Sequence, residues 1–261
     1  MKRVLIKNIL EKKGVSPITC LTAYSKPIAQ IIDKYCDIIL VGDSLGMVLY
    51  GMKSTRNVKF STMVEHAKAV KKSSKRSLVV FDMPYKTYEN KFTAYKNAKT
   101  AIKITKCDAV KIEGGKKVSN IVQYLVKKKI PVMGHIGLLP QSAVNFKVQG
   151  RSPNQKMKIL EDAKAVSESG VFAIVIECVT ESLAKKITEN VSVPTIGIGA
   201  SKYCDGQVLV IDDVIGLSNF LPKFVKRYAN VKKIIENSVK KYTKDVKLRR
   251  FPTNKNVYKI N

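Results

Sequence analysis

The chain has 261 residues, which suits one barrel-sized α/β domain or two small domains. Its apolar content of 45% and charged content of 26% are ordinary for a globular protein, and no run reaches the roughly 20 apolar residues of a membrane span. The formal net charge is +28, but lysines are spread along nearly every expected helix and no basic stripe alternates with aromatic residues. This pattern disfavours a membrane protein and favours a lysine-rich solvated surface over a specific nucleic-acid-binding face.

The beginning of the chain and the cysteines indicate a cytoplasmic protein. The first residues, MKRVLIKNILEKKG, interrupt their apolar residues with Lys, Asn and Glu at helical spacing, so we expect a helix over about 3–13 rather than a secretory signal. The cysteines are five in number and contain no C-x-x-C pair, which argues against a disulfide framework and against a zinc site.

Short apolar runs then alternate with helical patterns. Eight runs read as strands buried on both faces: 17–24, 37–44, 77–84, 109–115, 130–137, 172–178, 194–200 and 207–212. Helical patterns separate most of them, including 61–72, 93–105, 117–128 and 155–169. Ser61 and Thr180 stand where helix N-caps are expected, and Gly170 where a helix C-cap is expected.

This alternation predicts a closed (β/α)₈ barrel, with a doubly wound open sheet as the alternative. The link 201–206 is short for a crossover helix, so it is the least supported connection in the count of eight strand–helix units. The tail 221–247 reads as one or two amphipathic helices outside the repeat. We therefore expect a single domain over 1–261, with an extra N-terminal helix and C-terminal helices.

Ionisable residues end five consecutive runs: Asp43, Asp82, Glu113, His135 and Glu177. Any one of them alone could be a turn residue or a buried structural side chain. In an α/β barrel, however, the carboxyl ends of the strands form the active site, so their recurrence predicts one there. Lys111 stands two residues before Glu113 and so shares its face of the strand.

The carboxylates of Asp43, Asp82 and Glu113 on neighbouring strand ends need a cation. Two carboxylates about 4 Å apart repel by roughly 4 kcal/mol at an effective dielectric constant near 20. Oxygen ligands without cysteine favour Mg²⁺, which can chelate a 2-oxo acid and make the adjacent C–H acidic. Lys111 would then stabilise the developing negative charge, and Glu177, outside the metal cluster, is the candidate general base.

Several motifs resemble one known family. VGDSLGM at 41–47, VKIEGG at 110–115 and GHIGL-x-PQS at 134–142 occur in the order and spacing of the ketopantoate hydroxymethyltransferases, and the similarity runs from about Ile18 to Pro252. The resemblance implies a (β/α)₈ barrel of the phosphoenolpyruvate/pyruvate superfamily, assembled as a homodecamer. It also implies transfer of a hydroxymethyl group from the co-substrate 5,10-methylenetetrahydrofolate to 3-methyl-2-oxobutanoate, giving 2-dehydropantoate for pantothenate and coenzyme A synthesis.

The resemblance also implies roles for individual residues. It gives Asp43 and Asp82 as direct ligands of one Mg²⁺ per subunit, completed by Glu113, and Glu177 as the proton acceptor. Substrate contacts are implied for Asp43, Ser44, Asp82, Lys111 and His135.

Three positions depart from the family pattern. Leu139 stands where the family usually has threonine, the loop 143–147 looks shortened, and Asp212 replaces a usual histidine. These changes bear on folate binding and loop closure more than on the type of reaction. The alternatives are a related Mg²⁺-dependent 2-oxo acid lyase or mutase on the same barrel, and, from another class, a basic nucleic-acid-binding protein on an inactive barrel.

Overall fold

The computed structural model describes residues 2–143, 145–219 and 221–259. By the density of its internal contacts the chain divides into two compact units, Met1–Ile211 and Asp212–Asn261. The expectation of a single domain over 1–261 stays a prediction.

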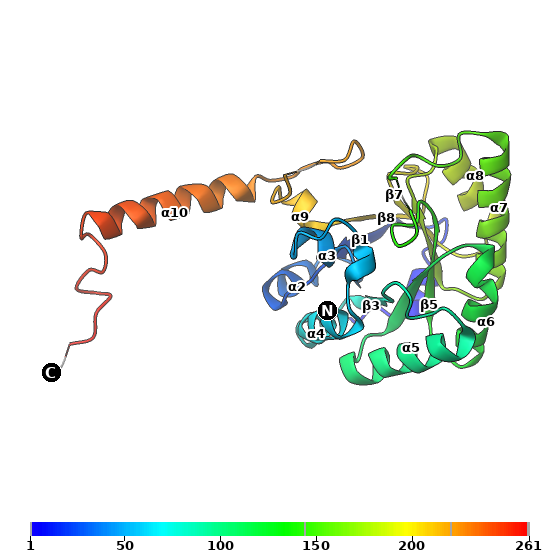
Figure 1. Cartoon of the computed structure of the whole chain (residues 1–261), viewed down its shortest axis with the longest axis horizontal. Coiled ribbons are helices and arrows are strands. Elements are labelled where there is room, and N and C mark those ends of the chain that lie inside the picture. The colour runs from blue at the N-terminus through cyan, green and yellow to red at the C-terminus, as the bar shows by residue number, and fades with distance from the viewer. Residues whose placement is uncertain (1, 144, 220, 260–261) are drawn as a thin grey trace. The chain divides into compact units, whose positions relative to one another are not determined.

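The first unit is built on a closed barrel of eight parallel strands (Figure 1). Each strand pairs with the next along the chain, and β8 pairs with β1 to close the ring. This confirms the (β/α)₈ barrel and excludes the doubly wound sheet. The strands are β1 Ile18–Thr22, β2 Ile38–Val41, β3 Leu78–Asp82, β4 Ala109–Glu113, β5 Val132–Gly137, β6 Ala173–Glu177, β7 Thr195–Ile198 and β8 Gly206–Leu209.

Helices follow most strands, and α5, α6, α7 and α8 lie outside the ring (Figure 1). They are α2 Lys26–Ile32, α3 Leu45–Val48, α4 Phe60–Ser73, α5 Lys91–Thr105, α6 Ser119–Lys127, α7 Pro153–Glu168 and α8 Glu181–Asn190, with the 3₁₀ turns η1 Thr55–Asn57 and η2 Lys116–Val118. The link between β7 and β8, all of it within the described residues, contains no helix, as its length predicted.

Two of the three predicted helix ends are confirmed. Thr180 is the N-cap of α8. Gly170 follows the C-cap of α7 with φ +88°, a left-handed conformation that glycine adopts without strain. The Ser61 prediction is wrong, because α4 already begins at Phe60 and has Lys59 as its N-cap.

The barrel core is filled by side chains from alternate positions of the strands, among them Ile38, Leu78, Met133 and Ile196. Ile9 of the N-terminal helix α1, Ile6–Leu10, belongs to the same buried cluster. The N–H of Val4 donates to the carbonyl oxygen of Arg76 at 2.7 Å, just before β3, and Nζ of Lys12 donates to that of Pro17 at 3.1 Å, just before β1. The segment around α1 therefore lies at the end of the barrel opposite the predicted site. The helix is shorter than the expected 3–13, because the chain after it tightens into i→i+3 turns that end at Gly14, with φ +66°.

The second unit contains the C-terminal helix α10, Val231–Lys247. The expected helical tail over 221–247 is thus helical only from Val231. Every residue of α10 lies in the described part of the chain, and none of them is buried. Ile235, Val239, Tyr242 and Val246 are all exposed and recur at helical spacing, so they form one apolar stripe.

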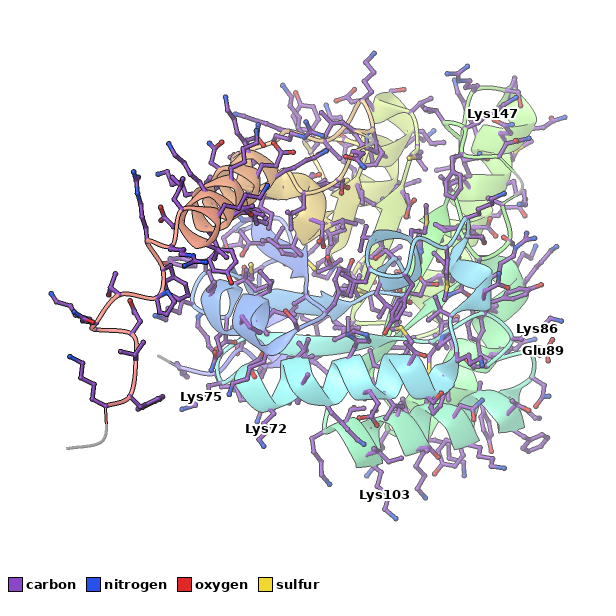
Figure 2. All side chains as sticks on the ribbon, turned by 60° about the vertical axis from the view of Figure 1, so that its left-hand side comes forward. Lys72, Lys75, Lys86, Glu89, Lys103 and Lys147 are labelled. Carbon is purple, nitrogen blue, oxygen red and sulfur yellow. The ribbon has the colours of Figure 1, made fainter. Side chains whose placement is uncertain are left out.

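The lysines are distributed over the surface of the first unit. Lys72 and Lys75, near the end of α4, project outward, as do Lys103 of α5 and Lys147 elsewhere on the surface (Figure 2). This fits a solvated basic surface rather than a concentrated nucleic-acid-binding face. Over the described ranges of the chain, no helix is both long and apolar enough to cross a bilayer.

Candidate active site

The predicted polar residues come together at the carboxyl ends of β2 to β6. Asp82, Glu113 and Glu177 are the last residues of their strands, Asp43 lies two residues after β2, and His135 lies two residues before the end of β5. The strand register sets Asp82 beside Lys111 and Glu113 beside His135. Because parallel neighbours point the same way, these side chains converge on the barrel mouth.

Lys111 is the cation at the centre of the cluster. Its Nζ lies 2.8 Å and 3.0 Å from the two carboxylate oxygens of Asp82, and 3.8 Å from Oε1 of Glu113. Burial alone would lower the pKa of Lys111, but the facing carboxylates outweigh it and raise that pKa. Burial also raises the pKa of Asp82, although Lys111 opposes this. The ammonium therefore stays charged, and it balances one of the buried carboxylates.

Asp43 makes no ion pair among the described residues, although the charge of Lys111 acts on it from a greater distance. Its backbone N–H donates to Oδ2 of Asp82 at 3.3 Å, and its own Oδ2 accepts a hydrogen bond from Nε2 of Gln141 at 2.9 Å. Burial, followed by the charge of Asp82, raises the pKa of Asp43 well above its usual range. Ser44 follows, and its hydroxyl lies 2.8 Å from the phenol oxygen of Tyr24.

His135 stands between two carboxylates. Its Nδ1 lies 3.5 Å from Oε1 of Glu113, and its Nε2 lies 3.3 Å from Oε2 of Glu177. At these distances neither nitrogen makes a well-aligned hydrogen bond within the described residues. Burial would lower the pKa of His135, as would Lys111, but the two carboxylates raise it to about 9. The two carboxylates thus favour the protonated form of the ring. The side chain of Glu177 is 16% exposed, whereas that of His135 is 2% exposed.

Sequence reasoning missed three residues that hold this cluster. Gln141, only 2% exposed, contacts Asp43 through its side chain and Glu113 through its backbone. Tyr88 donates to Oε1 of Gln141 at 2.5 Å, and Tyr24 contacts Ser44. Gln141 lies within the motif GHIGL-x-PQS, which was the one available signal, but a loop residue has no periodicity that shows where its side chain points.

The donor set suits a hard divalent cation. Four carboxylates face only two cationic side chains, Lys111 and His135, and the oxygen donors of Asp43, Asp82 and Glu113 are the kind that Mg²⁺ prefers. Across residues 2–143, 145–219 and 221–259, no three acidic, His or Cys side chains are arranged to hold a metal ion. Two of these carboxylates face an ammonium instead, since Lys111 pairs with Asp82 and lies 3.8 Å from Glu113. The metal roles of the three carboxylates stay predictions.

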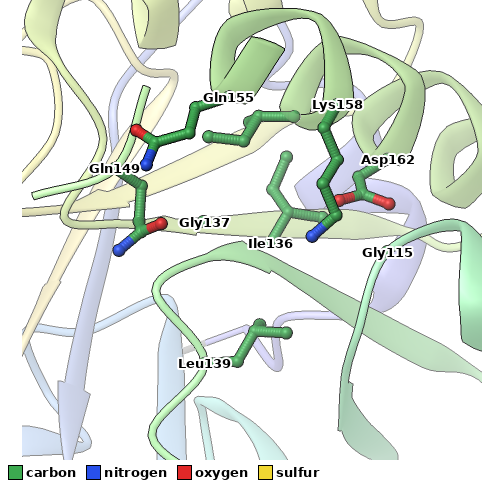
Figure 3. Close-up of a pocket in the computed structure, with 9 residues that line it drawn as sticks. Gly115, Ile136, Gly137, Leu139, Gln149, Gln155, Lys158 and Asp162 are labelled. Atoms are coloured by element: carbon green, nitrogen blue, oxygen red, sulfur yellow. The ribbon is translucent and has the colours of Figure 1, made fainter. Parts of the chain in front are cut away.

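A pocket lies behind the barrel wall, between β5 and α7 (Figure 3). Lys158 and Asp162 of α7 border it, with Gln149 and Gln155 on the other side. It includes none of the seven predicted site residues, so the predicted chemistry lies elsewhere.

The three departures from the family pattern lie outside the seven predicted site residues. Leu139 lines this pocket. The departure at 143–147 includes residue 144, which lies outside the described residues. At Asp212 burial raises the pKa of the carboxyl.

An eight-stranded parallel barrel with carboxylates, a lysine and a histidine at the ends of β2 to β6 defines the class: an α/β-barrel enzyme. The family is then given by sequence. The ketopantoate hydroxymethyltransferase family model matches residues 3–254, and the chain belongs to this family.

Individual relatives agree with this assignment. The chain is 55% identical to a 3-methyl-2-oxobutanoate hydroxymethyltransferase of Pelagibacter ubique (strain HTCC1062), covering 97% of this chain and 98% of that one. It is 48% identical to the enzyme of the same name from Anaplasma marginale (strain Florida), covering 97% and 94%.

Solved structures with the same fold are more distant. A phosphonopyruvate hydrolase in complex with oxalate and Mg²⁺ has a TM-score of 0.63 at 10% identity, covering 98% of this chain and 93% of that one. A 2,3-dimethylmalate lyase, described as a PEP mutase/isocitrate lyase superfamily member, has a TM-score of 0.63 at 11% identity, covering 97% and 87%. These similarities confirm the fold of the barrel.

Proposed function

We propose that the chain transfers a hydroxymethyl group from 5,10-methylenetetrahydrofolate to 3-methyl-2-oxobutanoate, giving 2-dehydropantoate, in a Mg²⁺-dependent reaction. The names of relatives at 48–55% identity support the acceptor and the group transferred. The observation that carries the proposal is the buried cluster of Asp43, Asp82 and Glu113 around Lys111 at the barrel mouth. The rival reaction, that of a lyase or mutase, is supported only by similarity of fold.

In this proposal Asp43, Asp82 and Glu113 would hold one Mg²⁺ per subunit. The ion would supply Lewis acidity at the 2-oxo group of the substrate. The excess of carboxylates over cations in the cluster supports this role, as does the raised pKa of Asp43. A distant structure with this fold is described as a complex with oxalate, a small dicarboxylate, and Mg²⁺. Since Lys111 pairs with Asp82 and lies 3.8 Å from Glu113, we expect its flexible side chain to move when the cation binds.

The remaining steps of the proposed reaction are assigned to side chains of the cluster. Glu177 takes the proton from C3 of the oxo acid, and the charged ring of His135, 3.3 Å away, orients its carboxylate. Lys111 offsets the negative charge that develops on the 2-oxo oxygen. Ser44, held by Tyr24, donates a hydrogen bond to the substrate carboxylate. C3 then forms the new C–C bond to the methylene carbon supplied by the folate. Both C–N bonds that hold this carbon break, one water molecule supplies the hydroxyl oxygen, and the two released protons pass to the folate nitrogens, so tetrahydrofolate leaves.

Product analysis tests the proposal directly. Purified protein is incubated with Mg²⁺, 3-methyl-2-oxobutanoate and methylenetetrahydrofolate, and 2-dehydropantoate is measured by mass spectrometry. We expect product that depends on the folate and disappears when EDTA is present. Product that is insensitive to EDTA would remove the magnesium part of the proposal. Cleavage of 2-oxo acids without folate-dependent product would favour the lyase alternative, and salt-sensitive DNA binding without product would favour the nucleic-acid alternative.

We further propose that the chain assembles with copies of itself in the cytoplasm, as the homodecamer that the family resemblance implies. The support from the structure is the exposed apolar stripe of α10, since such a helix face is normally covered in the working protein. Light scattering coupled to size exclusion measures the mass of the particle. A monomer of 29.1 kDa at micromolar concentration contradicts this part of the proposal.

A further inference from the structure

Gln141 is a buried amide on the loop that follows β5. The loop leaves the barrel at Gly137, where φ is +91° and a Cβ atom would lie 2.4 Å from the carbonyl oxygen of Glu177. Glycine allows this tight turn, which brings the chain back across the barrel mouth. Gln141 is 2% exposed, although the next residue, Ser142, is exposed to solvent. A buried polar side chain on an exposed loop calls for a specific explanation.

Both polar atoms of the Gln141 side chain make hydrogen bonds. Its Nε2 donates to Oδ2 of Asp43 at 2.9 Å and to the carbonyl oxygen of Met83 at 2.9 Å. Its Oε1 accepts from the hydroxyl of Tyr88 at 2.5 Å. Because the carbonyl oxygen of Met83 can only accept, it requires the NH₂ end of the amide, and this leaves Oε1 to accept from the hydroxyl of Tyr88. The amide N–H groups therefore point at the carboxylate and at the strand end of β3.

The backbone of the same residue reaches a second carboxylate. The N–H of Gln141 donates to Oε2 of Glu113 at 3.1 Å. Arg56, on η1, holds this piece of loop in place, since its Nε donates to the carbonyl oxygen of Gln141 at 2.8 Å and its Nη2 to that of Ser142 at 2.8 Å. One residue thus binds the ends of β2, β3 and β4 through Asp43, Met83 and Glu113.

We propose that Gln141 is a positioning residue that holds the Asp43 and Glu113 carboxylates in a fixed mutual geometry for the cation. The inference rests on the proposed function, because it assigns these two side chains to one metal site. An amide suits the task, since it donates hydrogen bonds to oxygens without adding charge to a cluster that already contains Lys111 and His135. Residues of this kind around a metal site set ligand orientation, and their loss weakens metal affinity by about 10- to 100-fold.

The choice of glutamine is specific in length and charge. Glutamate at this position would place a further carboxylate against Asp43 and the carbonyl oxygen of Met83. Methionine has nearly the same shape and makes none of the three side-chain hydrogen bonds, while the backbone N–H to Glu113 is kept. Comparing Gln141→Met with wild type therefore isolates the amide. The matched control is Ser142→Ala, one residue along the same loop, where the side chain is exposed.

The test measures binding of Mn²⁺, used as the probe cation, by electron paramagnetic resonance without substrates. We expect Gln141→Met to weaken Mn²⁺ binding by about 10- to 100-fold, and Ser142→Ala to stay within twofold of wild type. Tyr88→Phe, which removes the hydrogen bond to Oε1 of the amide, should weaken Mn²⁺ binding by a smaller factor, about three- to tenfold for the loss of one hydrogen bond. Unfolding midpoints are measured on the same samples.

The outcomes separate this inference from the proposed function. If wild-type protein binds no Mn²⁺, the magnesium site itself is wrong. If wild type binds Mn²⁺ and folded Gln141→Met binds it equally well, the proposed function stands and the positioning role is overturned. If Gln141→Met does not fold, Tyr88→Phe decides: weakened Mn²⁺ binding at an unchanged unfolding midpoint supports the role, and unchanged binding overturns it.

Discussion

Replacing Lys111 by methionine tests the electrostatics of the cluster most directly. The Lys111 ammonium lies 2.8 Å from an Asp82 carboxylate oxygen, and both side chains are about 95% buried or more. At that separation the Coulomb attraction is about 6 kcal/mol at an effective dielectric constant of 20. Desolvation offsets part of it, and removing one partner of a buried pair costs about 3–5 kcal/mol. We expect Lys111→Met to lower the free energy of unfolding by about that amount in EDTA.

Magnesium should reverse much of this loss. Without the ammonium the carboxylates of Asp43, Asp82 and Glu113 have greater need of a cation, so the variant should bind Mg²⁺ more tightly than wild type. A ligand present at 100 times its dissociation constant stabilises the folded state by about 2.7 kcal/mol. We therefore expect millimolar Mg²⁺ to restore about 2–3 kcal/mol to Lys111→Met, and less to wild type. Urea unfolding followed by circular dichroism, with EDTA or with Mg²⁺, measures both quantities.

Lys116→Met is the control for removing a lysine from an ion pair. Lys116 lies 3.4 Å from Glu161, but both side chains are more than half exposed, so the change should stay below about 1 kcal/mol. Two results would refute the reasoning. A loss of less than 1 kcal/mol for Lys111→Met in EDTA would mean that the buried pair contributes little. Equal Mg²⁺ stabilisation of variant and wild type would mean that the ammonium and the cation do not share the carboxylates.

Three further substitutions probe other parts of the molecule. Glu177→Gln should lower kcat by about 10²- to 10⁴-fold, and NMR that detects undiminished deuterium exchange at C3 of the oxo acid would rule out its role as the base. Tyr24→Phe removes a partner of Ser44 and should raise KM for the oxo acid about fivefold with a smaller change in kcat, which steady-state kinetics will test. Asp205→Asn should cost about 2 kcal/mol in urea unfolding at neutral pH. Burial would raise the pKa of Asp205, but hydrogen bonds from Lys13 and two backbone amides lower it, so its contribution is complete above the pKa of the unfolded state and lost as pH falls through the folded pKa. The variant should lack this part of the acid destabilisation, and an unchanged pH profile would contradict the assignment.

The strands could be predicted closely because each is a near-continuous apolar run that ends in polar residues. All eight observed strands fall at the predicted places, with ends shifted by a few residues at most, β8 starting at Gly206 instead of 207. Helix ends were harder to predict, since they depend on tertiary contacts that no local pattern contains. The turn after Leu10, for example, is fixed by the bonds of Lys13 to Asp205 at 2.9 Å and to the carbonyl oxygen of Thr188 at 2.6 Å, from parts of the chain almost 200 residues away.

The same reasoning explains which site residues could be predicted. The carboxyl ends of neighbouring parallel strands lie side by side at one end of the barrel. Asp82, Glu113 and Glu177 could therefore be grouped from the sequence alone. Gln141 could not be placed in this way, because it reaches Asp43 by a loop whose path depends on Gly137 and on Arg56. Tyr24 stands just beyond β1, outside the series of ionisable residues, and its contact with Ser44 appears only when the barrel closes.

The charge balance of the cluster is set by side-chain conformation, and here sequence reasoning reaches its limit. It placed Lys111 on the carboxylate face and assigned it to the substrate, whereas the ammonium pairs with Asp82. Both arrangements satisfy the same requirement, because buried carboxylates must have a cation near them, either an ammonium or a metal ion. If Mg²⁺ takes over the carboxylates as proposed, it frees the ammonium to face the oxo group of the substrate. Lys111 would then pair with Asp82 in the absence of Mg²⁺ and face the substrate in its presence. Stronger stabilisation of Lys111→Met than of wild type by Mg²⁺ would support this exchange, and equal stabilisation would indicate a fixed ion pair.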